Sequence, residues 1–243
     1  TGFSLTVNAG DLTVVGTGVS QVAANNLQLT TAGILTLDGT GARVVLGNAN
    51  QTFSAGGDLL VIGQANLTAT GTQQFLGGQG GSGDVSFQPS GGGIIANAAT
   101  QSFGATRDLL FDGGAASNEN IALSATGSQT FSAGRDIRLA GGAGASASVG
   151  ATLTGNGGQS LSASGNIDLL GGSGTGSAVN VVMTGDGNQS LNASGNISLS
   201  AGAGDDASVL VSATGAGAQS FYANGNLALN GGGIAATMKH FPG

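Results

Sequence analysis

The chain has little charge and contains no cysteine or tryptophan. Of its 243 residues, 7% are charged and two are proline, whereas about 25% of the residues in an average soluble domain are charged. Disordered chains depend on charged residues and proline, and here the apolar residues keep regular positions, so disorder is a poor explanation of the composition. The lack of cysteine does not by itself distinguish cellular compartments.

Basic residues are scarce as well, with five against twelve acidic ones and a net charge of −7. Because no basic run could follow a phosphate backbone, nucleic acid is not an expected partner. No apolar run approaches the roughly 20 residues that span a bilayer, so no membrane span is expected. Residues 1–4 contain neither an initiator Met nor a signal peptide. We therefore expect a mature or excised piece of a larger protein.

Glycine, in contrast, is abundant, with 49 residues, and hydrophobic residues make up 40% of the chain. The glycines show no three-residue period, which excludes a collagen triple helix. The hydrophobic content is sufficient for a core.

A triplet of glutamine, a small hydroxyl residue and a large apolar residue recurs along the chain. Its clearest copies are spaced by 28, 30, 30 and 30 residues and begin at Gln101, Gln129, Gln159, Gln189 and Gln219. Looser copies begin at Gln21, Gln51 and Gln73. Self-similarity with a period of about 20 to 50 residues indicates a solenoid or a propeller.

The repeat that begins at Gln159 shows how one unit is built. Apolar and polar residues alternate in three short stretches, 161–163, 167–169 and 179–183. Alternation with a period of two indicates strands. Residues 164–166 have a turn composition, and a glycine-rich stretch separates the second strand from the third. Each repeat therefore contains three short strands and three corners.

Such a unit exposes an apolar face that it cannot bury alone. We therefore predict an all-β fold, a parallel β-helix solenoid of about eight coils of ~30 residues, in which each strand pairs with its equivalents about 4.8 Å above and below. Residues 1–243 form a single repeat domain in this interpretation, with irregular ends at 1–20 and 231–243. A propeller would need four antiparallel strands and about 40 residues per blade, and helical repeats would need a 3.6-residue period that is absent here.

Equivalent positions of successive coils are expected to stack in columns. A core column would contain Phe53, Phe75, Phe103, Phe131, Leu161, Leu191 and Phe221. A turn column would contain Asn26, Asp58, Asp108, Asp136, Asn166, Asn196 and Asn226. Stacked amides can hydrogen-bond along the axis, whereas acids cannot do so among themselves. The 22-residue interval after Gln51 leaves almost no room for a loop, and residues 77–83 are expected to form a long flexible one.

We expect no catalytic, cofactor-binding or metal-binding residue. His240 is the only histidine and lies three residues from the end, where chains are commonly poorly ordered. Asp205–Asp206 is the only adjacent acid pair, and we interpret it as a solvated loop rather than a metal site. Gly80–Asp84 is one residue short of the calcium-binding G-G-x-G-x-D turn. The remaining acids are scattered along the coils, whereas a carbohydrate-cleaving β-helix would gather them in a groove.

Hydroxyl residues form a further column on the predicted outer surface, at Thr52, Ser102, Thr130, Ser160, Ser190 and Ser220. A second column, at Ser54, Ser132 and Ser162, is interrupted by Gly104, Asn192 and Tyr222. Regular hydroxyl rows on a flat β-helix face order ice-like water in some antifreeze proteins. Because the second column is broken and serine outnumbers threonine, we interpret these residues as a solvated strand face.

Segments of the form Gly-Asn-Ile/Leu-x-Leu, preceded by Ser-Leu/Phe-x-Ala, begin at Gly165, Gly195 and Gly225. They resemble the repeats of filamentous-haemagglutinin-like exoproteins, large bacterial adhesins exported by two-partner secretion, and the resemblance covers residues 21–230. It implies a right-handed β-helical stalk that is exported unfolded, folds outside the cell and acts in adhesion or biofilm matrix. The chain departs from the family in its longer repeat and in lacking a recognisable secretion domain.

The first functional hypothesis is a structural and adhesive segment of a bacterial surface or extracellular fibre protein, without catalysis or cofactor. Its expected partners are host-cell or matrix glycans or proteins, and further copies of itself through coil ends that expose unpaired strand edges. The alternative is a β-helical carbohydrate-active enzyme, for which a groove with clustered acids would be the sign. The third hypothesis is an ice-binding protein, which would show a flat and regular Thr/Ser face.

Overall fold

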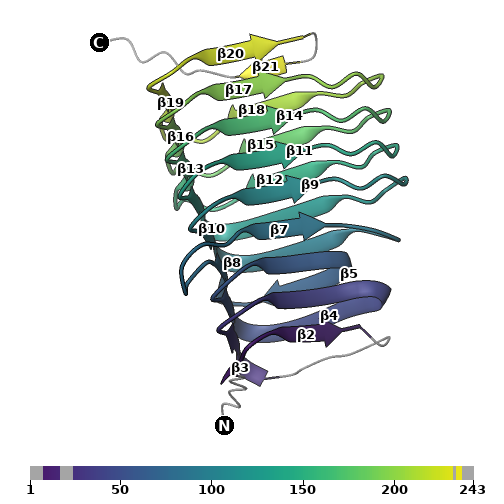
Figure 1. The fold of residues 1–243 in the computed structure, drawn as a ribbon. Coiled ribbons are helices and arrows are strands. Elements are labelled where there is room, and N and C mark those ends of the chain that lie inside the picture. Colours follow the sequence, from purple (N-terminus) through teal and green to yellow (C-terminus); the bar gives the residue numbers. More distant parts are fainter. Residues whose placement is uncertain (1–7, 17–23, 232–233, 237–243) are drawn as a thin grey trace.

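The computed structural model describes residues 8–16, 24–231 and 234–236. In these ranges every regular element is a β-strand, and the strands pair in parallel between stacked coils. Coils of about 28 residues form a β-solenoid of about seven turns (Figure 1). The predicted parallel β-helix is thereby confirmed.

Face 1 is the side of the solenoid that carries the glutamine triplets. The register places each triplet over the preceding one, so that Phe131 lies one coil from Leu161. Its strands are β1 (Asn8–Ala9), β3 (Ala24–Thr31), the last part of β4 (Leu35–Ala55), β6 (Thr72–Gly77), the second halves of β8 (Ile94–Ala105) and β10 (Ile121–Ala133), β13 (Gln159–Ala163), β16 (Gln189–Ala193) and β19 (Gln219–Ala223).

Faces 2 and 3 complete each coil, and the core is the space enclosed by the three faces. Face 2 contains β2 (Leu12–Val15), the first parts of β4 and β5 (Leu59–Ala69), β7 (Val85–Gln88), β9 (Leu109–Asp112), β11 (Ile137–Ala140), β14 (Ile167–Leu170), β17 (Ile197–Ser200) and β20 (Leu227–Asn230). Face 3 contains the middle of β4, the second part of β5, the first halves of β8 and β10, β12 (Val149–Leu153), β15 (Val179–Met183), β18 (Val209–Ala213) and β21 (Ile234–Ala236).

The three strands of a coil are separate in the C-terminal half, as predicted, but merge in the N-terminal half. Strand β4 runs through all three faces over 21 residues, and β5 passes from face 2 to face 3 without a loop. Gly63 makes this second corner in a left-handed conformation, with a φ of 76°, which glycine adopts without steric cost. The short interval after Gln51 therefore does correspond to a coil without a loop.

Strands also occur in both ends that the sequence predicts to be irregular. Strands β1 and β2 lie within residues 1–20, and β21 lies within residues 231–243. They form because each pairs with a neighbouring coil, β2 with β4 and β21 with β18. The expected triplet at Gln21 and the residue His240 lie outside the described part of the chain.

The core column predicted from the triplets is confirmed, and four phenylalanines in it stack ring on ring. The ring centroids of Phe53, Phe75, Phe103 and Phe131 are separated in turn by 5.1, 5.0 and 4.8 Å. Phe87 and Phe111 enter from face 2 and place their rings at steep angles against this stack. In the later coils Leu161 and Leu191 continue the column. Aromatic packing thus gives way to aliphatic packing toward the C-terminus.

Replacing Phe131 with Ala is expected to lower the free energy of unfolding by about 3–5 kcal/mol, because it opens a cavity in a stacked core. The matched control is Ser190→Ala on the outer side of face 1, which should change stability by about 0.5 kcal/mol or less. Urea denaturation of both variants provides the measurement. Similar midpoints would show that the inward and outward sides of face 1 are wrongly assigned.

Candidate functional site: the charged corner and the outer faces

The glutamine of each triplet points into the core and forms a continuous hydrogen-bonded ladder. The amide Nε2 of each ladder residue donates to Oε1 of the glutamine one coil earlier, at 2.6–2.9 Å for the steps from Gln51 to Gln189. Most of these amides also donate to a backbone carbonyl across the core, as Gln159 does to Ala151 at 2.9 Å. The ladder residues are Gln51, Gln73, Gln101, Gln129, Gln159, Gln189 and Gln219. The conspicuous glutamines of the sequence are therefore structural, and no surface ligand can reach the fully buried ones.

A second ladder runs along the corner between faces 1 and 2, and we call it the Asx column. In all but one of the successive steps an Asp or Asn Oδ1 accepts a hydrogen bond from the backbone N–H of the equivalent residue in the next coil, at 2.7–3.1 Å. Its members are Asp11, Asp58, Asp84, Asp108, Asp136, Asn166, Asn196 and Asn226. In the coil after Asp11 the equivalent position is Ile34, whose backbone N–H donates to Asp11 Oδ1. Because the donor is the backbone, carboxylates serve as well as amides.

This arrangement corrects the predicted turn column, which included Asn26 and omitted Asp11 and Asp84. Asn26 does not belong to it, since Asn26 lies on face 1 in register with Asn50, whose Nδ2 donates to it at 2.8 Å. Asp84 does belong to it, although in the sequence it closes the Gly80–Asp84 segment that falls one residue short of a calcium-binding turn. Its carboxylate accepts from the backbone N–H of Asp108 at 3.0 Å and from Arg107, so its oxygens are engaged in holding coils together.

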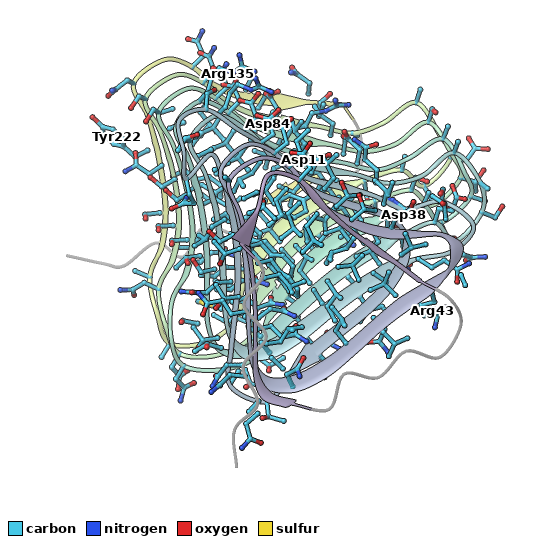
Figure 2. The ribbon with its side chains drawn as sticks, turned by 60° about the horizontal axis from the view of Figure 1, so that its bottom comes forward. Asp11, Asp38, Arg43, Asp84, Arg135 and Tyr222 are labelled. Atoms are coloured by element: carbon cyan, nitrogen blue, oxygen red, sulfur yellow. The ribbon has the colours of Figure 1, made fainter. Side chains whose placement is uncertain are left out.

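Two arginines reach one coil down this corner and bind the column carboxylates. Arg107 Nε donates to Asp84 Oδ1 and Arg135 Nε to Asp108 Oδ1, each at 2.7 Å. In each pair a terminal guanidinium nitrogen also bonds the second carboxylate oxygen. Figure 2 looks into the solenoid from its lower end and shows Asp84 and Arg135 at the same corner. The ion pairs thus connect successive coils in the same direction as the Asx column.

The electrostatics of Asp108 follow from these contacts. Burial acts to raise the pKa of the Asp108 carboxyl, but the hydrogen bonds from Arg135 and from the backbone N–H of Asp136 outweigh it, so the pKa is lowered. Glu119 behaves similarly in the loop between faces 2 and 3. Backbone N–H groups of Ala116 and Gly91 donate to its carboxylate and lower its pKa. Folding thus favours the ionised form of both carboxyls, whose hydrogen bonds hold backbone segments of neighbouring coils in place.

A different situation exists on the outer side of face 2, where Arg138 lies between two acids. Its Nε is 3.4 Å from Asp112 Oδ1, and Asp168 lies opposite Arg138 in the next coil. Burial raises the pKa of the Asp112 carboxyl, and Arg138 opposes it only in part. Burial and the nearby charge of Asp136 raise the pKa of Asp168. A carboxyl with a raised pKa can retain a proton, which a general acid requires, so this trio is the strongest chemical candidate on the surface.

The other candidates from the sequence are not brought together. Asp205 and Asp206 are exposed, and Asp206 has a left-handed backbone with a φ of 58°. Among the described residues, no three His, Cys, Asp or Glu side chains are grouped closely enough to hold a metal ion. In that same part of the chain no helix is long and apolar enough to cross a membrane.

The outer sides of faces 1 and 3 carry hydroxyl, amide and apolar residues, without charge on the paired strand positions from β4 onward. The larger apolar residues among them include Leu76 on face 1 and Ile95, Val182 and Leu210 on face 3. The predicted hydroxyl column is confirmed in register on face 1, where Gln74 occupies one step of it. The second column contains Leu76 in addition to the predicted interruptions, and it ends at the exposed Tyr222. Face 1 is therefore polar and neutral, with an irregular second row.

Four loops between faces 2 and 3 stack into a ridge along the upper part of the solenoid (Figure 1). Within this loop ridge, a backbone N–H of each loop donates to a carbonyl of the next, for example Ser146 to Thr175 at 2.9 Å. The residues at the tips are exposed, among them Ala145 and Thr175. The ridge consists of residues 113–120, 141–148, 171–178 and 201–208.

No family model, curated protein or solved structure matches this chain. Function must therefore be argued from the contacts and charges of its own residues.

Replacing Gln159 with Met should lower the free energy of unfolding by about 1–3 kcal/mol, because Gln129 Oε1 is left buried without its donor. Ser160→Ala, on the opposite side of the same strand, is the control and should be nearly neutral. The midpoints of urea unfolding compare the two. Equal midpoints would show that the glutamine ladder contributes nothing to stability.

Two Asp→Asn variants should change thermal stability in opposite directions near neutral pH. Asp108→Asn keeps the Oδ1 acceptor but loses the ion pair with Arg135, at a cost of about 1 kcal/mol or less. Asp112→Asn should stabilise, because it removes a charge that burial disfavours. The pKa of Asp108 is lowered by folding, so its contribution is present above the unfolded value and is lost as the pH falls through the folded one.

The pKa of Asp112 is raised by folding, so its cost is present above the folded value and disappears on acidification. Both differences from the wild type should therefore shrink below about pH 4. Melting curves at neutral and acidic pH test this. A destabilised Asp112→Asn variant at neutral pH would mean that the Arg138 contact outweighs burial.

Proposed function

We propose that this chain is a structural and adhesive segment of a bacterial cell-surface or extracellular fibre protein. The observation that carries the proposal is how the chain uses its polar groups. The glutamine ladder, the Asx column and the Arg107 and Arg135 ion pairs all connect one coil to the next. Side chains that an enzyme would direct into a site are here directed along the axis, where they hold a rod together.

The adhesive part of the proposal rests on the surfaces that remain. Rows of hydroxyl and amide groups on neutral faces present donors and acceptors without charge, which suits glycans or the polar surface of a protein. Loops tolerate variation while coil positions are constrained by stacking, so binding is assigned to the loop ridge and to the exposed tip of residues 79–82. The resemblance of the Gly-Asn-Ile-x-Leu segments to filamentous-haemagglutinin-like exoproteins supports a secreted or cell-surface location.

Charge on the loop ridge tests the adhesive role. Beads coated with the wild-type chain should be retained on an array of host-cell and matrix glycans and proteins, and the double variant Ala145→Lys, Thr175→Lys should lose most of this retention. Ser132→Lys places the same charge on an exposed position of face 1 and should leave it intact. Absence of retention for the wild type, or equal retention for all three, would contradict binding at the ridge.

A second candidate, a β-helical carbohydrate-active enzyme, is favoured by the raised pKa of Asp112 and Asp168 beside Arg138. A screen of glycan substrates separates the two functions, and we expect no turnover. Turnover that Asp168→Asn abolishes and Asp206→Asn preserves would establish the enzyme instead. Asp206 is a suitable control because it is an exposed acid on the loop ridge.

A further inference from the structure

The core of the solenoid is not uniform along its axis. Fully buried phenylalanines lie between residues 53 and 131, and ring contacts join them into one cluster that extends through successive coils. Aromatic pairs stabilise a core beyond what the burial of their area supplies. Above this cluster the described chain has no further ring contact, and Leu161 and Leu191 occupy the same column. The members of the aromatic cluster are Phe53, Phe75, Phe87, Phe103, Phe111 and Phe131.

The charged contacts between coils lie in the same part of the chain. Every ion pair among the described residues falls within residues 84–138. Arg107, Arg135 and Arg138 each reach a carboxylate of the coil below. Glu119 adds a further link, because its carboxylate accepts a backbone N–H of the coil below. Hydrogen bonds to charged groups are stronger than those between neutral groups. The aromatic cluster and the charged contacts therefore reinforce the same coils, residues 51–153, which we call the central section.

The coils above, residues 159–213, form the upper section and use weaker versions of the same contacts. Asn166 and Asn196 replace the acids of the Asx column, and the sequence has no arginine after Arg138. The coils of Leu161 and Leu191 pair with described neighbours on both sides. The difference between the two sections therefore lies within the array and is not an effect of its ends.

A solenoid converts this difference into an order of folding. Each coil contacts only its neighbours, so the stability of the array is approximately a sum over coils and their interfaces, and folding can begin at one place and spread. The first coils to stack must order their residues and close their loops before any interface stabilises them. The section with the strongest interfaces offsets this cost first, and it is also the last to open.

The central section ends in a surface that is prepared for the next coil. Gln129 Nε2 donates to Gln101 Oε1 at 2.8 Å, which fixes the amide and turns Gln129 Oε1 toward Gln159. At the corner, Asp136 Oδ1 accepts the backbone N–H of Asn166 at 2.7 Å. A coil that folds after the central section therefore meets acceptors whose positions are already set.

We propose that the central section is the folding nucleus of this chain and that the upper section folds on it as on a template. The upper coils are accordingly the first to open, and they open without unfolding of the central section. This inference goes beyond adhesion, because it concerns the order in which coils form and separate.

Opening in this order gives the rod a reserve of length, a consequence that rests on the proposed function. A folded coil contributes about 4.8 Å along the axis. The repeats that begin at Gln159 and Gln189 are each 30 residues long, and a chain of that length reaches about 100 Å when extended. An upper coil that opens under tension therefore lengthens the rod, while the central section stays folded and directs the return of the coil.

Hydrogen exchange of the full chain, followed by mass spectrometry at increasing urea concentrations below the unfolding midpoint, measures the order of opening. Backbone amides of residues 94–133 should exchange only when the whole chain unfolds. Amides of residues 159–200 should exchange about tenfold faster or more, through a partial opening that leaves the central section folded.

Fraying from the ends is separated from this effect by a matched comparison. Phe53 on β4 and Leu161 on β13 each lie on the third face 1 strand from the nearer end of the described chain. Fraying alone would give the two strands equal exchange, whereas the proposal requires slower exchange around Phe53.

Two substitutions in the core column test the order of folding, and both remove the same number of non-hydrogen side-chain atoms. Phe103→Leu weakens the aromatic cluster and keeps an apolar side chain, so it should slow refolding by about threefold or more. Leu191→Ala, in the same column of the upper section, should leave the refolding rate within about twofold of the wild type and accelerate unfolding. Stopped-flow mixing with urea provides both rates.

Three outcomes would contradict the proposed nucleus. Equal exchange along the whole array would show a single cooperative unit, and slowest exchange in residues 159–200 would place the nucleus in the upper section. Refolding slowed as much by Leu191→Ala as by Phe103→Leu would contradict the order of folding as well. None of these outcomes depends on binding to a surface, so a chain that fails to adhere can still fold in this order, and a chain that adheres can lack it.

Discussion

Parallel pairing of each strand with its equivalent in the next coil is the constraint on which the rest of the structure depends. It brings every residue within about 4.8 Å of its counterpart one coil away. A side chain is therefore tolerated only if it can stack on a similar one. Phenylalanine does so by ring stacking, glutamine by amide ladders, and Asx residues by accepting from the next backbone. The sequence therefore repeats, because each coil must offer the next one a similar residue at every stacked position.

The same constraint explains why so few residues are charged and where the charges lie. Like charges stacked at this spacing repel each other, and the neutral rows of faces 1 and 3 avoid that cost. At the corner, carboxylates do occur in consecutive coils, from Asp58 to Asp136. Arg107 and Arg135 lie between them and offset the repulsion. Asp112 and Asp168 are less well compensated by Arg138, which is why burial raises their pKa.

An array held together from coil to coil has no intrinsic end, and this links its stability to its proposed role. Each internal coil has both of its sides covered by neighbouring coils, and its glutamine and Asx side chains bond along the axis. Such stacking can be repeated indefinitely, which suits the proposed role as a rod, and loops that project from the rod are free to contact other surfaces.

The periodicity of the sequence alone determined the strand positions, the parallel stacking, the phenylalanine column and the outward hydroxyl column, because each of these depends only on a constant repeat and on alternation within strands. Tertiary structure alone decided that the glutamines point inward, since the period-two pattern does not say how a polar residue forms its hydrogen bonds inside a core.

The tertiary structure also decided which residues belong to the Asx column. Coils near the N-terminus are shorter than 30 residues, and the loop before Asp84 absorbs extra ones, so counting from the triplets misplaced Asn26 and missed Asp84. The contacts of Arg107, Arg135 and Arg138 cross from one coil to the next, and a pairing between coils becomes visible only when the register is known.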